Sequence, residues 1–454
     1  MSARRLALVA AGVLAALLPA RADEPLSLDA AVQLALAHSK GAQLAQLKVE
    51  EAGAELRSAR LQRYPRVNVI GLAGRYYEPL DVKLKAGALT PLLDGLGTGL
   101  GLGALSPTLG QFPPADLTLL QGERHQYLGG LSVLQPLTQQ WRIGSGLAAA
   151  QAGRVAAQRE AARTAVQIRA AVEQLFAGIL LEQSRAQAHA ARVAFLERRL
   201  RDAENARSVG EALDDSVLGA RAELAQARAD GVRSEQERTK LVLQLADLIG
   251  RAGAEDITVG ADLPQRPGQT LAHWLSRVAA NPDRAVAEAT AERARAGVRA
   301  SRQARIPDLT LFASGYWQEG QALVPARGGV AGLALNWEIF DFGRRSSELS
   351  RSRILHRQAE TNRDRLEEEA AREIRLAWQD YQYAGELIAL AEQARDYRRR
   401  AAELARQSAA NGLALPTKVL ETEADLRKAE SDWLGATLQR HVALLRLHAL
   451  AGSL

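Results

Sequence analysis

Cysteine is absent from this chain of 454 residues, and the only methionine is the first residue. Without cysteine the protein has no disulfide bond, no thiolate metal ligand, no thiol nucleophile and no lipid attached to an N-terminal cysteine. Aromatic residues make up only 4% of the chain, which excludes a large aromatic core. Alanine is abundant instead, together with arginine, glutamate, glutamine and leucine. This composition is typical of long, closely packed helices.

Dense charge of one sign is also missing. The formal net charge is +6, but three arginines lie in the predicted leader, and without them 55 basic residues face 52 acidic ones. Basic and acidic residues are interleaved along the whole chain, and no dense block of one sign is longer than the three arginines at 398–400. A nucleic-acid-binding protein typically shows a concentrated basic patch interleaved with aromatic residues. We therefore expect no nucleic-acid partner.

Residues 1–22 have the pattern of a cleavable export signal. Two arginines precede an apolar stretch at 6–18, and Ala-Arg-Ala at 20–22 matches an A-x-A cleavage site. The apolar stretch is shorter than the roughly 20 residues that a membrane-spanning helix needs. No other part of the chain has 18 consecutive apolar residues. We therefore expect an exported mature chain that starts at Asp23 and has no membrane helix.

The mature chain contains an internal duplication. Residues 210–250 align without a gap with residues 412–452, and both segments begin and end with glycine. Each half reads as a short helix, a medium helix, a strand, a loop, a second strand, a very long helix, a turn and a medium helix. The expected repeats are 23–251 and 271–454, joined by a linker at 252–270 that is rich in Gly, Pro and Asp.

The very long helices are expected at about 144–208 and 343–410. Neither segment contains proline, and at about 1.5 Å per residue each helix would be roughly 100 Å long. Apolar residues recur at steps of three and four, and charged residues fill the other face. A filamentous coiled coil would explain these segments alone, but it would not explain the strands between them.

Four segments of about ten residues read as strands. Along the last of them, apolar residues at odd positions from 331 to 339 alternate with smaller or polar ones. Strand length and alternation match membrane barrel strands, and aromatic residues gather in and beside these segments as in interfacial girdles. Four strands cannot close a barrel, and open edges are not tolerated in lipid, so several chains must share one barrel. The four segments are 66–77, 127–136, 308–317 and 330–339.

No motif indicates catalysis or cofactor binding. The glycine run 95–103 lacks the spacing of a phosphate-binding loop, and we expect it inside the long apolar connection 78–126, the outer loop of the first hairpin. His441 and His448 are seven residues apart on one expected helix, where a packed or solvated pair is favoured over a metal site. The sequence therefore predicts no enzyme, no cofactor and no metal centre.

Five segments in series are specific enough to indicate a known family: "LSLDAAVQLALAHS" (26–39), Tyr64-Pro65, "SVGEALDDSVLGARAEL" (208–224), "LNWEIFDFG" (335–343) and "ANGLALPTKVLETEADL" (410–426). With these segments the chain resembles the TolC-like outer-membrane efflux proteins, over essentially the whole mature chain and in the family's duplicated order. The resemblance implies a mainly α fold with a small membrane β-barrel part. It also implies a homotrimer, whose twelve strands make one barrel in outer-membrane lipid and whose twelve helices continue it as a periplasmic tunnel.

The same resemblance implies how the helices are used. The two long helices would run the length of the tunnel, and short helices near 27–38 and 270–280 would form an equatorial belt. Such proteins are passive ducts that dock to a periplasmic adaptor protein and an inner-membrane pump, and their cargo can be drugs, metal ions, metabolites or polypeptides. The medium helices that would stack end to end beside the long ones are 41–63 with 213–250 and 283–305 with 413–450.

Two candidate sites follow from the resemblance. The helix-reversal tips would be gripped by adaptor hairpins, although their glycines alone could simply supply the positive φ of a tight turn. Carboxylates in the family often line a constriction a turn or two after the second tip; Lys418 and Glu421 hold those positions here. The alternative is that they form an intrahelical pair on a solvated face. The adaptor-docking candidates are Val209, Gly210, Ala212, Gly412, Leu413 and Ala414.

Two other classes of protein were weighed. A periplasmic coiled-coil scaffold that never enters a membrane would explain the helices but not the alternating strands. A stand-alone porin would explain the strands but would leave the long helices without a purpose. We therefore expect an outer-membrane channel with a long periplasmic extension.

Overall fold

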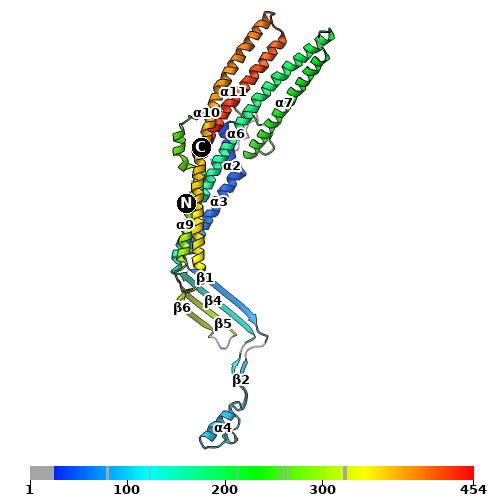
Figure 1. The fold of residues 1–454 in the computed structure, drawn as a ribbon. Coiled ribbons are helices and arrows are strands. Elements are labelled where there is room, and N and C mark those ends of the chain that lie inside the picture. The colour runs from blue at the N-terminus through cyan, green and yellow to red at the C-terminus, as the bar shows by residue number, and fades with distance from the viewer. Residues whose placement is uncertain are drawn as a thin grey trace, which may run out of the picture. The chain divides into compact units, whose positions relative to one another are not determined.

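The computed structural model describes residues 25–77, 81–121, 123–211, 213–254, 257–260, 263–264, 266–320 and 325–454 (Figure 1). The predicted export signal lies outside them. The chain divides into two compact units: unit 1 comprises Met1–Gly53, Ala152–Glu292 and Arg357–Leu454, and unit 2 comprises Ala54–Gln151 and Arg293–His356. Four helices, α3, α6, α9 and α10, continue from one unit into the other, so the units are divisions of continuous helices.

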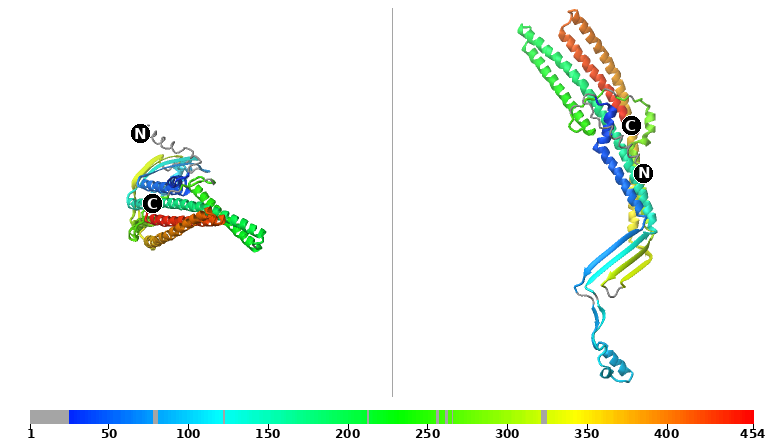
Figure 2. Two further views of the ribbon diagram at one scale, coloured as in Figure 1. Left: turned by 90° about the horizontal axis from the view of Figure 1, so that it is seen from above. Right: turned by 180° about the vertical axis from the view of Figure 1, so that it is seen from behind.

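Two helical hairpins dominate unit 1 (Figures 1 and 2). In the first, α6 reverses into α7, and in the second, α10 reverses into α11. The long helices hold 70 and 67 residues and end within a residue of the predicted positions. The helices of this unit, some shared with unit 2, are α2 (Leu28–His38), α3 (Lys40–Leu61), α6 (Gln139–Ser208), α7 (Asp214–Leu248), α8 (Leu271–Ser276), η1 (Val278–Ala280), α9 (Pro282–Gln303), α10 (Arg344–Ala410) and α11 (Pro416–Leu450).

Each hairpin has its own core beside a short helix. In the first core, α2 packs its Leu28, Ala31, Val32 and Ala35 against α6 and α7. In the second, α8 and η1 contribute Trp274 and Val278, which pack against α10 and α11. The same kind of hydroxyl cap starts both short helices: Ser27 Oγ accepts from the Ala30 amide, and Thr270 Oγ1 accepts from the His273 amide, both at 3.3 Å. The two halves are therefore built alike, as the duplicated fold predicts.

Unit 2 holds a four-stranded antiparallel sheet in the order β1-β4-β5-β6. The central pairing joins β4, from the first half of the chain, to β5, from the second. The outer strands β1 and β6 each pair on one side only. The strands are β1 (Arg66–Arg75), β4 (His125–Pro136), β5 (Asp308–Glu319) and β6 (Arg327–Asn336).

The last strand differs from its prediction at both ends. It was expected at 330–339 but runs from Arg327 to Asn336. Asn336 pairs with Asp308, and the next residue on the partner side is Pro307, which has no N–H to continue the ladder. The apolar alternation at Trp337 and Ile339 therefore continues past the end of the strand. At its start, Gly328 and Gly329 pair with β5 but gave no apolar signal.

Aromatic side chains of β5 lie across glycines of the neighbouring strands. A Cβ at Gly129 would stand 1.9 Å from the Trp317 ring, and one at Gly328 would stand 2.6 Å from the Tyr316 ring. These glycines leave room for rings that cover the neighbouring backbone, a common means of shaping a curved sheet. The sequence analysis did not identify these pairs.

The connection 78–126 was expected to be one long loop, and this prediction was wrong. It contains the hairpin of β2 (Asp81–Leu84) and β3 (Leu117–Gln121) and two helices, α4 (Thr90–Gly99) and α5 (Ser106–Leu109). Leu92, Leu93 and Leu96 supply helical spacing at the start of the glycine run, and Pro91 stands in the first turn of α4, where proline is tolerated. The first five residues of the glycine run at 95–103 are therefore helix.

Candidate functional site

The two helix reversals in unit 1 have the same backbone design. Gly210 and Gly412 have φ values of 82° and 72°. In the first reversal the Glu211 amide donates to Ala206 O, and in the second the Leu413 amide donates to Ser408 O, both at 2.8 Å. This five-residue step is the Schellman closure that a left-handed glycine allows after a helix. A Cβ on either glycine would meet nothing within 4 Å, so φ alone calls for glycine here.

Apolar side chains project from both reversals. Val209 is 69% exposed and Leu413 is 82% exposed, whereas Ala414 is half-buried. Ala212, the other candidate, lies outside the described residues. Sequence reasoning missed two further apolar residues of the tips, Leu213 at 76% and Leu415 at 73% exposed. They occupy the N-cap positions of α7 and α11, where a polar cap is the usual choice, and that exception was a readable signal.

Helices α6 and α11 contact each other a short distance from the two tips. Thr417 Oγ1, at the start of α11, donates to Asp202 on α6. Leu420 packs against a small core that contains Phe195 and Leu196 of α6. Farther from the tips, α6, α7 and α11 line a groove of about 630 Å³ that includes His189, Asp425 and Lys428 among its walls. The tips and this groove form a mixed apolar and charged surface.

Lys418 and Glu421 form an intrahelical ion pair. Lys418 Nζ lies 2.8 Å from Glu421 Oε2, and the two side chains are 59% and 40% exposed. This contact corresponds to the alternative of a pair on a solvated face within one chain. Both side chains remain partly exposed in this pair, so groups outside the chain can still reach them.

The strand register separates the sheet of unit 2 into two chemically different faces. Partners in an antiparallel ladder point to the same face, so the registers sort every side chain. One face is almost wholly apolar over the middle of the strands: Val67, Val69, Leu131, Val133, Leu311, Ala313, Ala331, Leu333 and Leu335. The other face is mixed. It carries polar Asn68, Ser132, Thr310, Ser314 and Gln318 among apolar Ile70, Leu72, Leu128, Leu134, Phe312 and Val330. A continuous apolar face on one side of a sheet is what a membrane barrel presents to lipid.

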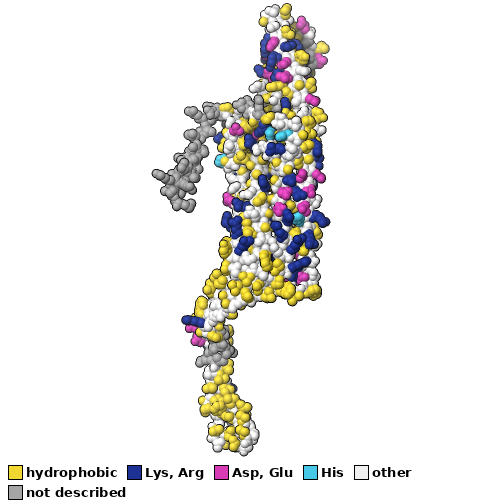
Figure 3. Space-filling model, turned by 90° about the vertical axis from the view of Figure 1, so that its left-hand side faces the viewer, with side chains coloured by type: hydrophobic (Ala, Val, Ile, Leu, Met, Phe, Trp, Pro, Cys, Tyr) yellow, Lys and Arg dark blue, Asp and Glu magenta, His cyan; other side chains and the backbone are white. Residues whose placement is uncertain are grey.

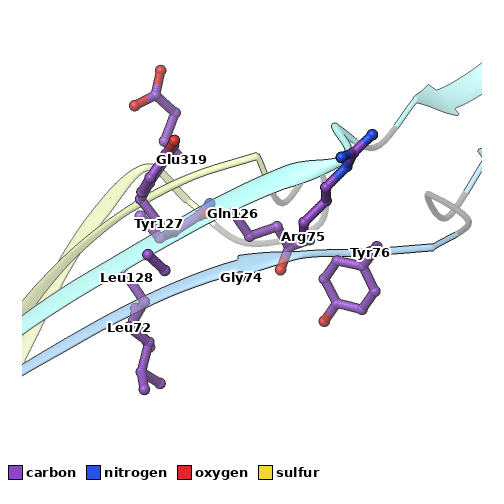
Figure 4. A pocket seen from close by; sticks show the side chains of 10 residues that line it. Leu72, Gly74, Arg75, Tyr76, Gln126, Tyr127, Leu128 and Glu319 are labelled. Carbon is purple, nitrogen blue, oxygen red and sulfur yellow. The ribbon is translucent and has the colours of Figure 1, made fainter.

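Aromatic rings gather at both ends of the strands. At the end that joins the helices, Trp141, Trp337 and Phe340 are exposed by 58%, 54% and 72%. At the opposite end, Tyr76 and Tyr127 border a groove of about 400 Å³ formed by β1, β4 and β5 (Figure 4). Figure 4 shows Arg75 and Tyr76 on opposite sides of β1. Rings at both ends match the girdles of membrane barrels.

Unit 1 carries an apolar stripe that stays largely exposed in the part of the chain that the structure describes. Side chains of α10 recur at steps of four and three, as at the core positions of a coiled coil. Together with the single-sided pairing of β1 and β6, this stripe indicates that the chain works beside further copies. Its largest exposed side chains are Tyr383, Leu387, Leu390, Tyr397 and Leu404.

A buried ion cluster fastens the linker between the repeats. Glu173 of α6 is fully buried, and Arg266 donates to it twice, each at 2.7 Å. Arg169 lies 3.3 Å away, and His441 Nε2 on α11 lies 3.5 Å away, too far for a well-formed hydrogen bond. Burial raises the pKa of the Glu173 carboxyl, but His441, Arg266 and Arg169 outweigh burial and lower that pKa to about 2. The cluster is structural: a satisfied carboxylate at this pKa is a poor acid or base.

The histidines form no metal centre within the described residues. His441 faces Glu173, while His448 packs edge-on against Trp274 with ring centroids 4.9 Å apart. No group of three or more metal-ligating side chains occurs in the part of the chain that the structure describes. Burial and nearby Arg266 lower the pKa of His448, which favours its neutral form.

One helix among the described residues has a window that could cross a membrane. In α6, 18 residues reach a mean hydropathy of 1.3, and 33% of them are buried. The sequence has no uninterrupted apolar run of that length, so the window includes charged residues. A core helix of a soluble body passes the same test. Because α6 carries the Glu173 cluster and packs in the first core, we assign it to unit 1.

Comparison with protein families finds a match that covers most of the chain. The model of the outer membrane efflux protein family matches residues 31–251 and 276–453. The two matched segments fall on the two halves of the duplicated fold. No sequence among curated proteins matches this chain.

Solved structures share the fold at low identity. The chain is similar to the outer membrane protein VceC of Vibrio cholerae, with 18% identity, a TM-score of 0.71 and coverage of 94% of this chain and 96% of that one. The Campylobacter jejuni CmeC outer membrane channel has 14% identity and a TM-score of 0.73, with coverage of 94% and 86%. The open Neisseria gonorrhoeae MtrE outer membrane channel has 18% identity and a TM-score of 0.70, with coverage of 94% and 88%.

Proposed function

Since this chain belongs to the outer membrane efflux protein family, we propose that it is the passive exit duct of an efflux or secretion system, located in the outer membrane with a long periplasmic extension. The family and the fold are those of channels, and the proposal contains no enzymatic step. The observation that carries it is the almost wholly apolar face of the sheet, opposite a mixed face that carries the polar side chains of the strands. In a water-soluble scaffold, such an exposed apolar sheet face would be unfavourable because it would contact water.

Three copies of the chain would complete the barrel. Four strands per copy give twelve, an even number within the range of closed membrane barrels, and β6 of one copy would pair with β1 of the next. In unit 1, the α10 stripe has a fitting counterpart on another copy. Small residues of α6 and α7, among them Ala190, Ala194 and Gly231, line a groove of about 680 Å³. Helices pack side by side when large side chains of one helix insert into holes between residues of its neighbour.

Domain limits follow the same proposal. We assign residues 1–22 to a cleaved leader, 23–251 to the first repeat, 252–270 to the linker and 271–454 to the second repeat. The two segments that match the family model support this division. Arg266, held by Glu173, would then fix the linker to the first repeat.

The first prediction concerns location and assembly. The mature protein, beginning at Asp23, should fractionate with outer membranes as an SDS-resistant trimer that becomes monomeric on heating, because closed barrel strands resist detergent. Gel electrophoresis of heated and unheated membranes measures this. A soluble monomer in the periplasm after gentle lysis would contradict the duct.

We assign the two helix-reversal tips to the periplasmic adaptor, which would couple the duct to an inner-membrane pump. Exposed apolar side chains on rigid, glycine-closed turns offer a preformed surface for a partner's helical hairpin. The groove among α6, α7 and α11, farther along the same helices, would receive the next part of the hairpin. Val209, Gly210, Ala212, Gly412, Leu413 and Ala414 are the proposed contact residues.

A bulky residue at the second tip should separate docking from folding. Leu413→Trp should weaken adaptor binding at least about tenfold and abolish transport, with normal trimer yield, because residue 413 is exposed and contacts little in the chain. Gly343→Ala is the structural comparison, because Gly343 has φ 88° and lies outside the tips: strain at positive φ should lower trimer yield without lowering transport per trimer. Adaptor pull-down and an efflux assay measure both. Loss of trimer in Leu413→Trp would favour a purely structural tip.

We also propose that Lys418 and Glu421 line the periplasmic constriction. Threefold symmetry would make each a ring, and charges in a narrow opening are weakly screened. Lys418→Glu should raise cation preference in planar-bilayer recordings, because it replaces a mixed ring by an acidic one; Glu421→Ala should lower it. If the permeability ratio is unchanged in both variants, the pair seen here at 2.8 Å is only an intrahelical pair outside the pore.

A further inference from the structure

A leucine-rich lobe, residues 86–115, lies at the end of the β2–β3 stem and has a strongly apolar surface. It contains eight leucines and a single charged residue, Asp94. Figure 3 shows hydrophobic side chains over this lobe, at the lower end of the view. Exposed apolar surface of this kind normally marks an interaction site. Its most exposed side chains are Leu92 (61%), Leu96 (54%), Leu100 (73%), Leu102 (70%) and Leu109 (68%).

The lobe is a folded unit with satisfied polar groups. Asp94 Oδ1 accepts from the Ser106 amide at 2.7 Å, which ties α4 to α5, and hydrogen bonds from Ser106 lower the pKa of that carboxyl. Thr90 Oγ1 accepts from the Phe112 amide at 2.9 Å. A Cβ at Gly97 would stand 2.4 Å from Gly103 O, so glycine permits the close turn between the helices. The polar groups face inward and the leucines face out.

Topology places the lobe at the outer end of the barrel. It interrupts the connection from β1 to β4, whereas the opposite ends of these strands join α3 and α6. With the helices in the periplasm, the lobe lies on the extracellular side. Its stem also starts from β1, the edge strand that would face the neighbouring copy.

The charges of the stem disfavour a lipid partner. Two lysines, Lys83 and Lys85, are matched by two aspartates, Asp81 and Asp116. Asp116 also has a hydrogen-bond partner within the chain, because its Oδ1 accepts from the Ala86 amide at 2.7 Å. A surface that binds anionic headgroups typically carries an excess of basic residues beside its apolar part. Here the excess is missing.

We propose that the lobes of the three copies pack against one another by their leucine faces and form an apolar cap over the outer mouth of the barrel. This proposal rests on the three-copy assembly of the proposed function. One barrel holds three identical lobes at one end, and tethering gives them a high effective concentration. Self-association removes the leucines from water without any other partner. The occupant of the leucine face is therefore a second copy of this chain.

The absence of cysteine makes cross-linking a direct test. In Leu100→Cys, a short bismaleimide added to intact cells should join lobes and give a covalent dimer on gels of heated samples. Tyr77→Cys is the matched control: residue 77 is 94% exposed at the end of β1, on the barrel rim, where copies are farther apart, and its variant should stay monomeric. Unheated samples report the trimer separately.

The remaining outcomes each overturn the cap. If the trimer forms but Leu100→Cys gives no dimer and reacts with a membrane-impermeant maleimide, the lobe is free in water. If it reacts only with a lipid-soluble maleimide, the lobe is in lipid. Either result contradicts the cap but leaves the proposed channel function intact. If no trimer forms, both proposals are contradicted. As a functional readout, the double variant Leu96→Asp/Leu100→Asp should raise single-channel conductance at normal trimer yield, whereas Tyr77→Asp should not.

Discussion

Replacing Glu173 by glutamine should destabilise the folded chain by about 3–5 kcal/mol, because it leaves Arg266 and Arg169 without their buried counter-charge. The linker between the repeats would lose the contact that holds it. We expect a lower urea midpoint for loss of helical circular dichroism in detergent. Since Glu173 contacts neither tips nor strands, transport per remaining trimer should be unchanged.

The matched control is Glu223→Gln. Glu223 pairs with Arg199 at 2.6 Å, but both side chains are nearly half-exposed, so the loss should stay below about 1 kcal/mol. Equal losses in the two variants would show that burial of the Glu173 cluster is unimportant.

Lowering the pH should reduce the difference in stability between wild type and Glu173→Gln. The pKa of Glu173 falls from its ordinary 4.5 to about 2 on folding, so its contribution is complete above pH 4.5 and is lost as pH falls toward 2. A shift of that size corresponds to about 3 kcal/mol. The stability difference between wild type and variant should therefore shrink across this window. A difference that is constant with pH contradicts the pKa shift.

Gly320→Ala should sharply reduce the fraction of chains that reach the heat-stable assembly. Gly320 has φ 92°, and a Cβ there would stand 2.2 Å from the His125 carbonyl oxygen. Backbone strain adds about 1–2 kcal/mol and the overlap about 1–3 kcal/mol more, because the clashing atom belongs to the β4 backbone and cannot swing away.

Gly253→Ala separates the two contributions. Gly253 has φ 83°, but a Cβ there would meet nothing within 4 Å, so strain acts alone. We expect a clearly smaller loss of assembly than in Gly320→Ala, measured as the heat-modifiable band per total chain. Equal losses would mean that the His125 backbone yields freely.

Local signals were enough to predict the helical architecture. The ends of α6 and α10 are confirmed at Ser208 and at Ala410, because each is followed within two residues by a glycine that closes the helix. The fold class is confirmed as well: mainly helical, duplicated, with a small strand portion. Strand ends were predicted less well, because pairing partners decide them. Pro307 ends the β5–β6 ladder, although it lies outside β6.

Two features could not be predicted from the sequence. The Glu173–Arg266 contact joins residues 93 positions apart, and Arg266 lies in a linker whose composition suggests only a connection. The sequence predicts a loop for the leucine-rich lobe, because glycine and proline are frequent in it. Its helices persist because Gly97 and the Asp94–Ser106 hydrogen bond let α4 and α5 close on each other.

The pairing of β4 with β5 has a consequence for how a ring of copies comes apart. Each chain contributes two β-hairpins, so three copies would form a ring of six with near-sixfold order. The junctions would alternate in kind: β4–β5 lies within a chain, whereas β6–β1 joins different chains. Only the second kind depends on protein concentration. Dilution or mild denaturant should therefore part the ring at three places and release joined pairs of hairpins, never single ones.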